Sequence, residues 1–208
     1  MDVSRPYSAV CPTLDGDVLE VLAGTTMALT GRQVALLTGR KSHSGVLAVL
    51  NRLTEHGLVS RIELNHAYLF ALNRDHLAAP AVEILVGMRR ALFEEIRNVI
   101  DDWSITPVHA SLFGSAARGD GDTQSDFDLL VVRPDSVDED ESAWRSQIDN
   151  LVDLVRRRTG NQVSVIERDK SGMERLREAE PPILSELLAD AIVFSGSRSQ
   201  LADMLEAV

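Results

Sequence analysis

The chain contains a single cysteine, Cys11, among 208 residues, and aromatic residues make up only 4% of it. One thiol forms no internal disulfide and supplies too few ligands for a zinc site. No apolar run approaches the roughly 18 residues that span a bilayer. Residues 1–10 also lack the basic start and apolar core of a signal peptide. These absences argue against a disulfide-stabilised secreted domain and against a membrane partner, so we expect a cytoplasmic protein.

Acidic residues are in excess, and their distribution is uneven. The net charge is −11, whereas residues 1–100 contain ten basic and ten acidic side chains, so the second part of the chain carries the whole excess. This asymmetry predicts two units with different partners. Residues 31–61 carry five basic side chains against Glu55 alone. A local positive charge is typical of a nucleic-acid surface, although from the charge alone a solvated helix face is the better explanation.

Residues 14–74 show the order helix, helix, helix, hairpin. Thr30 and Gln33 have capping-box spacing at the second helix, and Ser42 or Ser44 begins the third. Two apolar strands, 58–64 and 67–72, follow. The chain also has the pattern Leu50-x-x-Leu53-x-x-x-Gly57-Leu58-Val59 just before the hairpin. The order of elements and this pattern together resemble bacterial winged helix-turn-helix regulators.

The winged-helix resemblance implies that duplex DNA is a partner, with the third helix in the major groove. A homodimer on paired half-sites would be the corresponding assembly. The alternative is a domain that only mediates dimerisation or partner binding. The residues expected to contact DNA lie at the start of the third helix, further along it and on the wing: Arg40, Lys41, Ser42, His43, Ser44, Arg52 and Arg61.

The most informative segment for chemistry is residues 108–132. A buried strand, 108–113, is followed by Gly114 and Ser115, and a short helix is expected from Ala116 to the break at Gly119. A Gly-Ser turn that opens a helix presents backbone N–H groups and a hydroxyl to a ligand, which is typical of phosphate binding.

Two carboxylates follow this turn. Asp126 and Asp128 lie two residues apart, and we expect both on one strand. Residues two apart in a strand project to one face, so the two carboxylates should converge beside the Gly-Ser turn. Hard oxygen ligands near a phosphate suit Mg²⁺ or Mn²⁺. The alternative is that both carboxylates only cap a strand and that the Gly-Ser turn is an ordinary one.

The pattern Gly114-Ser115-x-x-Arg118-Gly119, followed by Ser125-Asp126-x-Asp128-Leu129, resembles the signature of the nucleotidyltransferase superfamily with the DNA polymerase beta type of fold. It is most similar to the minimal branch, over about residues 105–195. The resemblance implies metal-dependent transfer of a nucleotidyl group from a nucleoside triphosphate to a hydroxyl of a protein, RNA or small molecule. It further implies that Asp126 and Asp128 are catalytic and hold the metal, whereas nucleotide binding falls to Gly114, Ser115, Arg118 and Ser125.

One family position differs. The family pattern has a third carboxylate on a later strand, and here the aligned residue is Ser164. A serine does not act as a base at neutral pH. Glu167 is expected on the opposite face, and Asp153 or Asp169 remain open as substitutes. The alternative function is therefore a DNA-binding regulator whose degenerate transferase domain only binds nucleotide or a partner, a reading that could relate to toxin–antitoxin pairs.

Together these observations predict an α+β protein. We expect a winged helix-turn-helix domain at 1–76, a linker helix at 77–103, and a small mixed α/β nucleotidyltransferase domain at 104–208. The linker prediction rests on an apolar stripe at three- and four-residue spacing, with Pro80 in the first turn.

Overall fold

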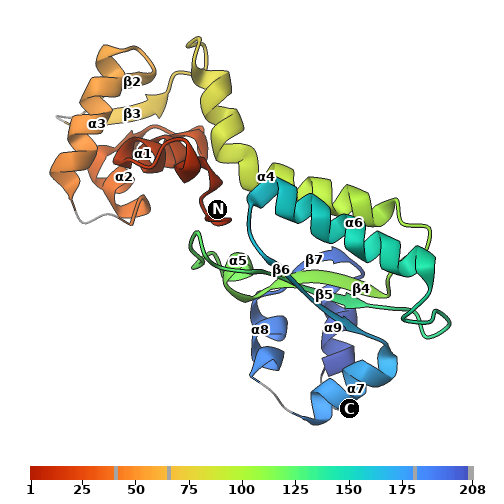
Figure 1. The fold of residues 1–208 in the computed structure, drawn as a ribbon. Helices are drawn as coiled ribbons and strands as arrows, with labels where there is room; N and C mark the ends of the chain where they lie inside the picture. Colours follow the sequence, from red (N-terminus) through yellow and green to blue (C-terminus); the bar gives the residue numbers. More distant parts are fainter. Residues whose placement is uncertain (40–41, 65–66, 180–181, 206–208) are drawn as a thin grey trace. The chain divides into compact units, whose positions relative to one another are not determined.

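The computed structural model describes residues 1–39, 42–64, 67–179 and 182–205 (Figure 1). The chain divides into two compact units. One unit is Arg5–Met88, and the other combines Met1–Ser4 with Arg89–Val208. Met1–Ser4 groups with the second unit because Val3 is buried in the core of that unit. Helices and two sheets are present, which confirms a mixed α and β architecture.

The first unit contains three helices and a three-stranded antiparallel sheet. The helices are α1 (Leu14–Ala23), α2 (Gly31–Leu37) and α3 (His43–Glu55), preceded by the short 3-10 helix η1 (Pro6–Ala9). The strands β1 (Leu29–Thr30), β2 (Val59–Leu64) and β3 (Ala67–Leu72) are ordered β1-β3-β2.

Local sequence signals explain where these helices begin. The Thr30 side chain accepts a hydrogen bond from the Gln33 N–H while the Gln33 side chain accepts from the Thr30 N–H, which confirms the predicted capping box. Ser42 is the N-cap of α3 and accepts from the Gly45 N–H. These bonds satisfy backbone donors that have no partner within the first turn of a helix.

Helix α4 (Ala79–Asp101) serves both units. Its first half contributes Ala79 and Val82 to the core of the first unit, whereas Leu92 and Ile96 are buried in the core of the second. The predicted linker helix is therefore not a free connection, because each end has an apolar face packed in a different core. The division between units falls within it, after Met88.

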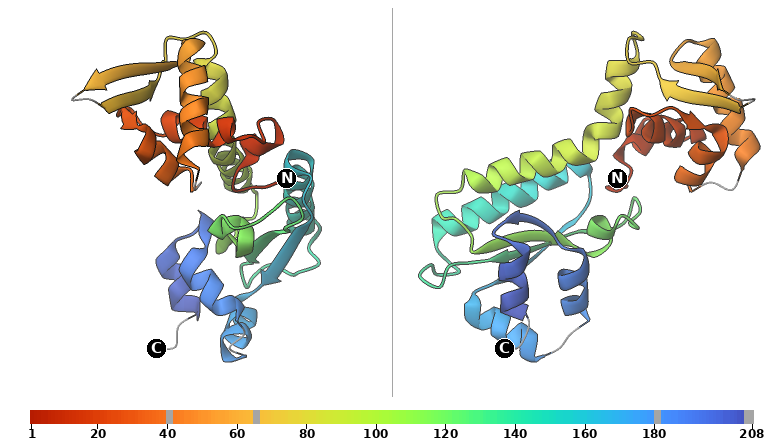
Figure 2. Two further views of the ribbon diagram at one scale, coloured as in Figure 1. Left: turned by 90° about the vertical axis from the view of Figure 1, so that its left-hand side faces the viewer. Right: turned by 180° about the vertical axis from the view of Figure 1, so that it is seen from behind.

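The second unit is built on a four-stranded mixed sheet with helices on both faces (Figures 1 and 2). The strands are β4 (His109–Phe113), β5 (Phe127–Val132), β6 (Val163–Arg168) and β7 (Ile192–Ser195), in the order β6-β5-β4-β7. β4 pairs antiparallel with β5 and β7, and β5 pairs parallel with β6. The helices are α5 (Gly114–Arg118), α6 (Ser142–Thr159), α7 (Lys170–Glu178), α8 (Ile183–Asp190) and α9 (Arg198–Leu205).

Strand alternation separates the two faces of this sheet. Leu129 and Val131 of β5 belong to a core that also contains residues of α4 and α6. Leu130 and Val132 belong to a core shared with α7, α8 and α9. Burial on both faces explains why β5 is an almost continuous apolar run. No helix in the described part of the chain is long and apolar enough to cross a membrane.

Candidate nucleotide and metal site

The pairing of β4 with β5 brings the Gly-Ser turn against one carboxylate. Phe113, the last residue of β4, lies opposite Asp128 in the antiparallel register. The next residue, Gly114, has a φ of 71°. A Cβ atom on Gly114 would lie 2.6 Å from Oδ2 of Asp128. Position 114 therefore requires glycine for two reasons: the backbone is left-handed there, and the Asp128 carboxylate approaches too closely for a side chain.

The two aspartates differ in their local structure. Asp128 lies within β5 and is half-buried, whereas Asp126 precedes the strand by one residue and is exposed. The prediction that both lie on one strand is therefore wrong for Asp126. It lies outside because the backbone pairing with β4 ends at Phe113–Asp128 and the ladder with β6 begins at Phe127.

The negative charge of Asp126 changes the pKa of the neighbouring Asp128. Burial raises the pKa of Asp128, and the negative charges of Asp126 and Glu186 raise it further, while Arg118 opposes them. A carboxyl whose folded-state pKa is raised stabilises the fold below its unfolded pKa. That contribution is lost as the pH rises through the folded pKa. At neutral pH the ionised Asp128 thus costs stability, which is expected of a group retained for binding rather than for folding.

The loop between α5 and β5 brings the Ser125 hydroxyl back towards Ser115 of the turn. A Cβ on Gly121 would lie 3.2 Å from the Ser115 and Ser125 hydroxyl oxygens, so the two side chains flank this glycine. The Ser125 hydroxyl accepts from the Asp122 N–H at 2.8 Å and donates to Asp122 Oδ1 at 3.1 Å. These bonds give the loop a defined turn that returns the chain to Asp126.

Arg118 lies at the end of α5 and is held by two acids. It pairs with Asp120 at 3.2 Å and with Glu186 of α8 at 3.3 Å. The Asp120 hydrogen bond is the main reason that the pKa of Arg118 is raised, with Glu186 adding to it. Glu186 was not predicted from the sequence. It reaches the site because α8 packs on α5, a tertiary contact that no local spacing encodes.

Ser164 occupies the position predicted for it. In the parallel ladder of β5 and β6, Ser164 pairs with Asp128, and it is exposed. Glu167 instead accepts hydrogen bonds from the Trp144 indole at 2.8 Å and from Arg133 at 3.0 Å. Asp169 caps α7 by accepting from the Gly172 N–H. These two acids are therefore committed to structural contacts elsewhere.

Asp153, the other acid considered as a substitute, lies exposed on α6. That helix belongs to the core on the face of Leu129, whereas Asp128 alternates onto the face of Leu130. Asp153 therefore does not reach the pair.

The donor set fits a divalent cation of the Mg²⁺ or Mn²⁺ type. Asp126 and Asp128 supply hard carboxylate oxygens, and their mutual repulsion would be relieved by a cation. Among the described residues, no group of three or more potential ligands is arranged to hold a metal. The two aspartates would therefore share the ion with water and substrate phosphates, which is usual for Mg²⁺.

The predicted DNA-contacting residues lie in the first unit, and their settings differ. His43 and Ser44 are exposed in the first turn of α3, and the Arg61 guanidinium lies 4.6 Å from the ring centre of Tyr68 on the hairpin. Arg52 forms an ion pair with Asp15 of α1, and the Ser42 hydroxyl is used as the α3 cap. Arg40 and Lys41 lie outside the described residues.

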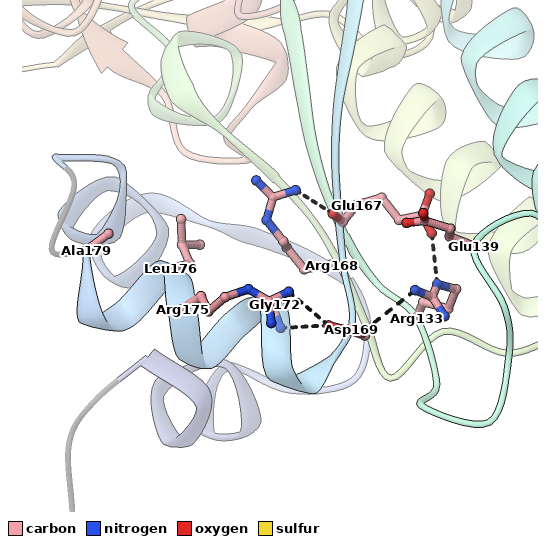
Figure 3. Close-up of a pocket in the computed structure, with 9 residues that line it drawn as sticks. All are labelled: Arg133, Glu139, Glu167, Arg168, Asp169, Gly172, Arg175, Leu176 and Ala179. Atoms are coloured by element: carbon pink, nitrogen blue, oxygen red, sulfur yellow. Dashed lines mark hydrogen bonds and ion pairs between the residues drawn. The ribbon is translucent and has the colours of Figure 1, made fainter.

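A separate polar cavity of about 430 Å³ lies beside α7 (Figure 3). Its charges compensate one another, since Arg133 pairs with Glu167 and lies 3.9 Å from Asp169, and Arg175 lies 4.0 Å from Asp169. Glu167 and Arg168 are at the opposite end of β6 from Ser164. This cavity is therefore distinct from the Asp126–Asp128 site.

Comparison with known proteins finds a family match within the second unit. Residues 94–186 match the family model of the nucleotidyltransferase domain. The matched range contains the Gly-Ser turn, both aspartates and Ser164. No curated protein matches the chain.

Two solved structures resemble part of the chain. One is a crystal structure of a toxin–antitoxin with AMP-PNP, with 17% identity and a TM-score of 0.38. The other is a mutant of the toxin–antitoxin MntA-HpeT, with 15% identity and a TM-score of 0.38. Each match covers 54% of this chain and 80% of the other.

The close approach at Gly114 generates a test. We expect Gly114→Ala to displace the Asp128 carboxylate and to weaken Mn²⁺ binding, measured by calorimetry, by about tenfold or more. Gly160→Ala is the matched control, because Gly160 also has a positive φ of 73° but nothing within 4 Å of an added Cβ. Both variants should lose roughly 1–2 kcal/mol through backbone strain. Equal Mn²⁺ affinities in the two variants would contradict the role assigned to this contact.

Proposed function

We propose that the second unit transfers a nucleotidyl group from a nucleoside triphosphate to a hydroxyl of a protein, RNA or small molecule. The observation that carries this proposal is the register that puts Asp128 against Gly114, with Asp126 close enough to raise its pKa. A turn suited to phosphate and a pair of carboxylates suited to a cation are thereby brought together. The family match over residues 94–186 supports the same reaction class.

In this proposal the residues divide the work by their chemistry. Gly114 and Ser115 contact the triphosphate through backbone N–H groups and the hydroxyl, and Ser125 supports them from the facing loop. Arg118 exchanges Asp120 or Glu186 for a phosphate oxygen. Asp126 and Asp128 would hold Mg²⁺ or Mn²⁺. The ion would neutralise negative charge as the acceptor oxygen bonds the α-phosphorus and pyrophosphate leaves.

Among the described residues, none is placed as an evident base for the acceptor hydroxyl. Ser164 stands opposite Asp128 where a carboxylate would serve, and a serine does not take a proton at neutral pH. Glu186 is near enough to influence Asp128, but it is paired with Arg118. We therefore infer that turnover is slow and that deprotonation is left to the substrate phosphate or to solvent.

The aspartates provide the direct test of transfer. Asp126→Asn and Asp128→Asn should each abolish metal-dependent transfer of label from nucleoside triphosphates to cell lysate, while the fold is retained. Because the pKa of Asp128 is raised in the metal-free protein, the Mn²⁺ affinity of the native protein should fall on acidification at a higher pH than an ordinary aspartate, with its pKa near 3.9, would give. Asp128→Asn should also raise the melting temperature of the metal-free protein at neutral pH. Undiminished transfer by both variants would remove the pair from the mechanism.

The serine at the third position gives a gain-of-function prediction. Ser164→Asp should raise the transfer rate, by up to about 100-fold, because a positioned general base is typically worth that much or more. Ser164→Asn is the matched control, since it has similar size but no basic carboxylate. A native enzyme that is fast, and that Ser164→Asp slows, would show that another residue serves as the base.

A second candidate function is a DNA-binding regulator whose transferase domain only binds nucleotide or a partner. The serine opposite Asp128 is the observation that favours it.

The three helices and the β1-β3-β2 sheet of the first unit have the order of a winged helix-turn-helix. We propose that α3 and the β2–β3 hairpin contact duplex DNA, with the protein acting as a homodimer. His43, Ser44 and Arg61 are exposed there, whereas the Arg52–Asp15 ion pair favours a structural role for Arg52.

Salt dependence tests the DNA proposal. Arg61→Ala, and the sequence-based pair Arg40→Ala with Lys41→Ala, should weaken binding to the protein's own promoter region. Each lost phosphate contact should reduce the slope of log K against log salt by about 0.9. Arg157→Ala is the control and should leave the slope unchanged, because Arg157 is an exposed residue of α6 in the second unit. If the native protein shows no salt-sensitive binding to this DNA, the proposal of a DNA-binding regulator is wrong.

A further inference from the structure

A buried asparagine contacts the backbone beside the two aspartates. Asn161 follows α6 and is only 4% exposed. Its side-chain Nδ2 donates to the Ser125 carbonyl at 2.8 Å and to the Met1 carbonyl at 3.0 Å, and its Oδ1 accepts from the Met1 nitrogen at 2.7 Å. The amide thus has partners for both Nδ2 hydrogens and for its oxygen, which a buried polar group requires.

The next residue along contacts the other side of the same aspartate. The Phe127 N–H donates to the Gln162 carbonyl at 2.8 Å. Ser125 and Phe127 are the two neighbours of Asp126, so residues 161 and 162 hydrogen-bond the backbone immediately before and immediately after it.

Asp126 depends on these backbone bonds more than Asp128 does. Asp128 lies in a ladder between β4 and β6, where its backbone is paired on both sides. Asp126 is exposed and lies outside the strand. Its location is therefore set by the peptide groups that flank it, and one of these is oriented by a side chain rather than by strand pairing.

We propose that Asn161 is a positioning residue for the metal site, which orients the Ser125–Asp126 peptide so that the Asp126 carboxylate faces the same cation as Asp128. This inference rests on the proposed function, since it assumes that the two aspartates share an ion. Residues that orient metal ligands without touching the metal typically account for a 10- to 100-fold effect on affinity.

The test compares three variants in the full chain. Asn161→Ala removes the bond to the Ser125 carbonyl. Asn161→Asp keeps the size and the acceptor but loses the donor, and its added negative charge would by itself strengthen cation binding. Ser111→Ala is the matched control. Ser111 is also buried, and its hydroxyl hydrogen-bonds the His109 ring at 2.9 Å, away from Asn161 and Ser125.

Mn²⁺ alone is the probe, titrated by calorimetry, and melting temperature and amide hydrogen exchange are recorded beside it. All three variants should melt below the native protein, because each loses a buried hydrogen bond. Only the Asn161 variants should bind Mn²⁺ about tenfold or more weakly, and only they should show faster exchange of the Phe127 amide without metal.

The outcomes separate the two proposals. Native protein that fails to bind Mn²⁺ contradicts the proposed function and this inference together. Native protein that binds Mn²⁺, with folded Asn161 variants that bind it equally well, overturns the inference alone. A Ser111→Ala affinity as low as that of the Asn161 variants would also overturn it, because general destabilisation would then explain the loss.

Discussion

The candidate site depends on one steric constraint, the approach of the Gly114 backbone to the Asp128 carboxylate. Any side chain at position 114 would meet that carboxylate at 2.6 Å. The constraint is imposed by the β4–β5 register, which places Phe113 opposite Asp128 at the last paired position. The turn that follows β4 must therefore pass directly over the end of β5. A phosphate held by this turn and a cation held by Asp128 would be adjacent without any further adjustment of the backbone.

The surroundings of this contact set its charge. Three acidic groups, Asp126, Asp128 and Glu186, lie close enough to interact, and Arg118 is the opposing charge. Without a cation, this arrangement disfavours the ionised form of Asp128, so the ionised carboxylate lowers the stability of the folded state. The cores on the two faces of the sheet provide the compensating stability, because β5 is buried on both sides. Repulsion among the acidic groups thus lowers the stability of the fold locally, and the well-packed cores of the second unit offset this loss.

Much of the local structure could be predicted from the sequence. The capping box at Thr30 and the end of α5 at Gly119 follow from short-range spacing. The placement of Ser164 opposite Asp128 is expected from the family resemblance, which aligns Ser164 with the third carboxylate. The contacts of Glu186 and Asn161 could not be predicted, because each joins residues far apart in the chain through helix packing or a buried amide.

The ion pair of Arg52 shows the same limit. A helical position and a positive charge predict a DNA contact, and no local spacing shows that Asp15, its ion-pair partner, lies on another helix. Similarly, residue spacing alone does not show that Asp126 falls just outside β5.

The most direct test of the account is to map bound Mn²⁺ by paramagnetic broadening of backbone amide signals, with and without a nucleoside triphosphate. We expect Mn²⁺ to broaden residues 114–115 and 126–128 together, and the nucleotide to tighten binding at the same place. The acidic run at 135–141 provides an internal comparison, since it offers carboxylates without a phosphate-binding turn. Broadening confined to residues 135–141, with 114–115 and 126–128 unaffected, would contradict the account.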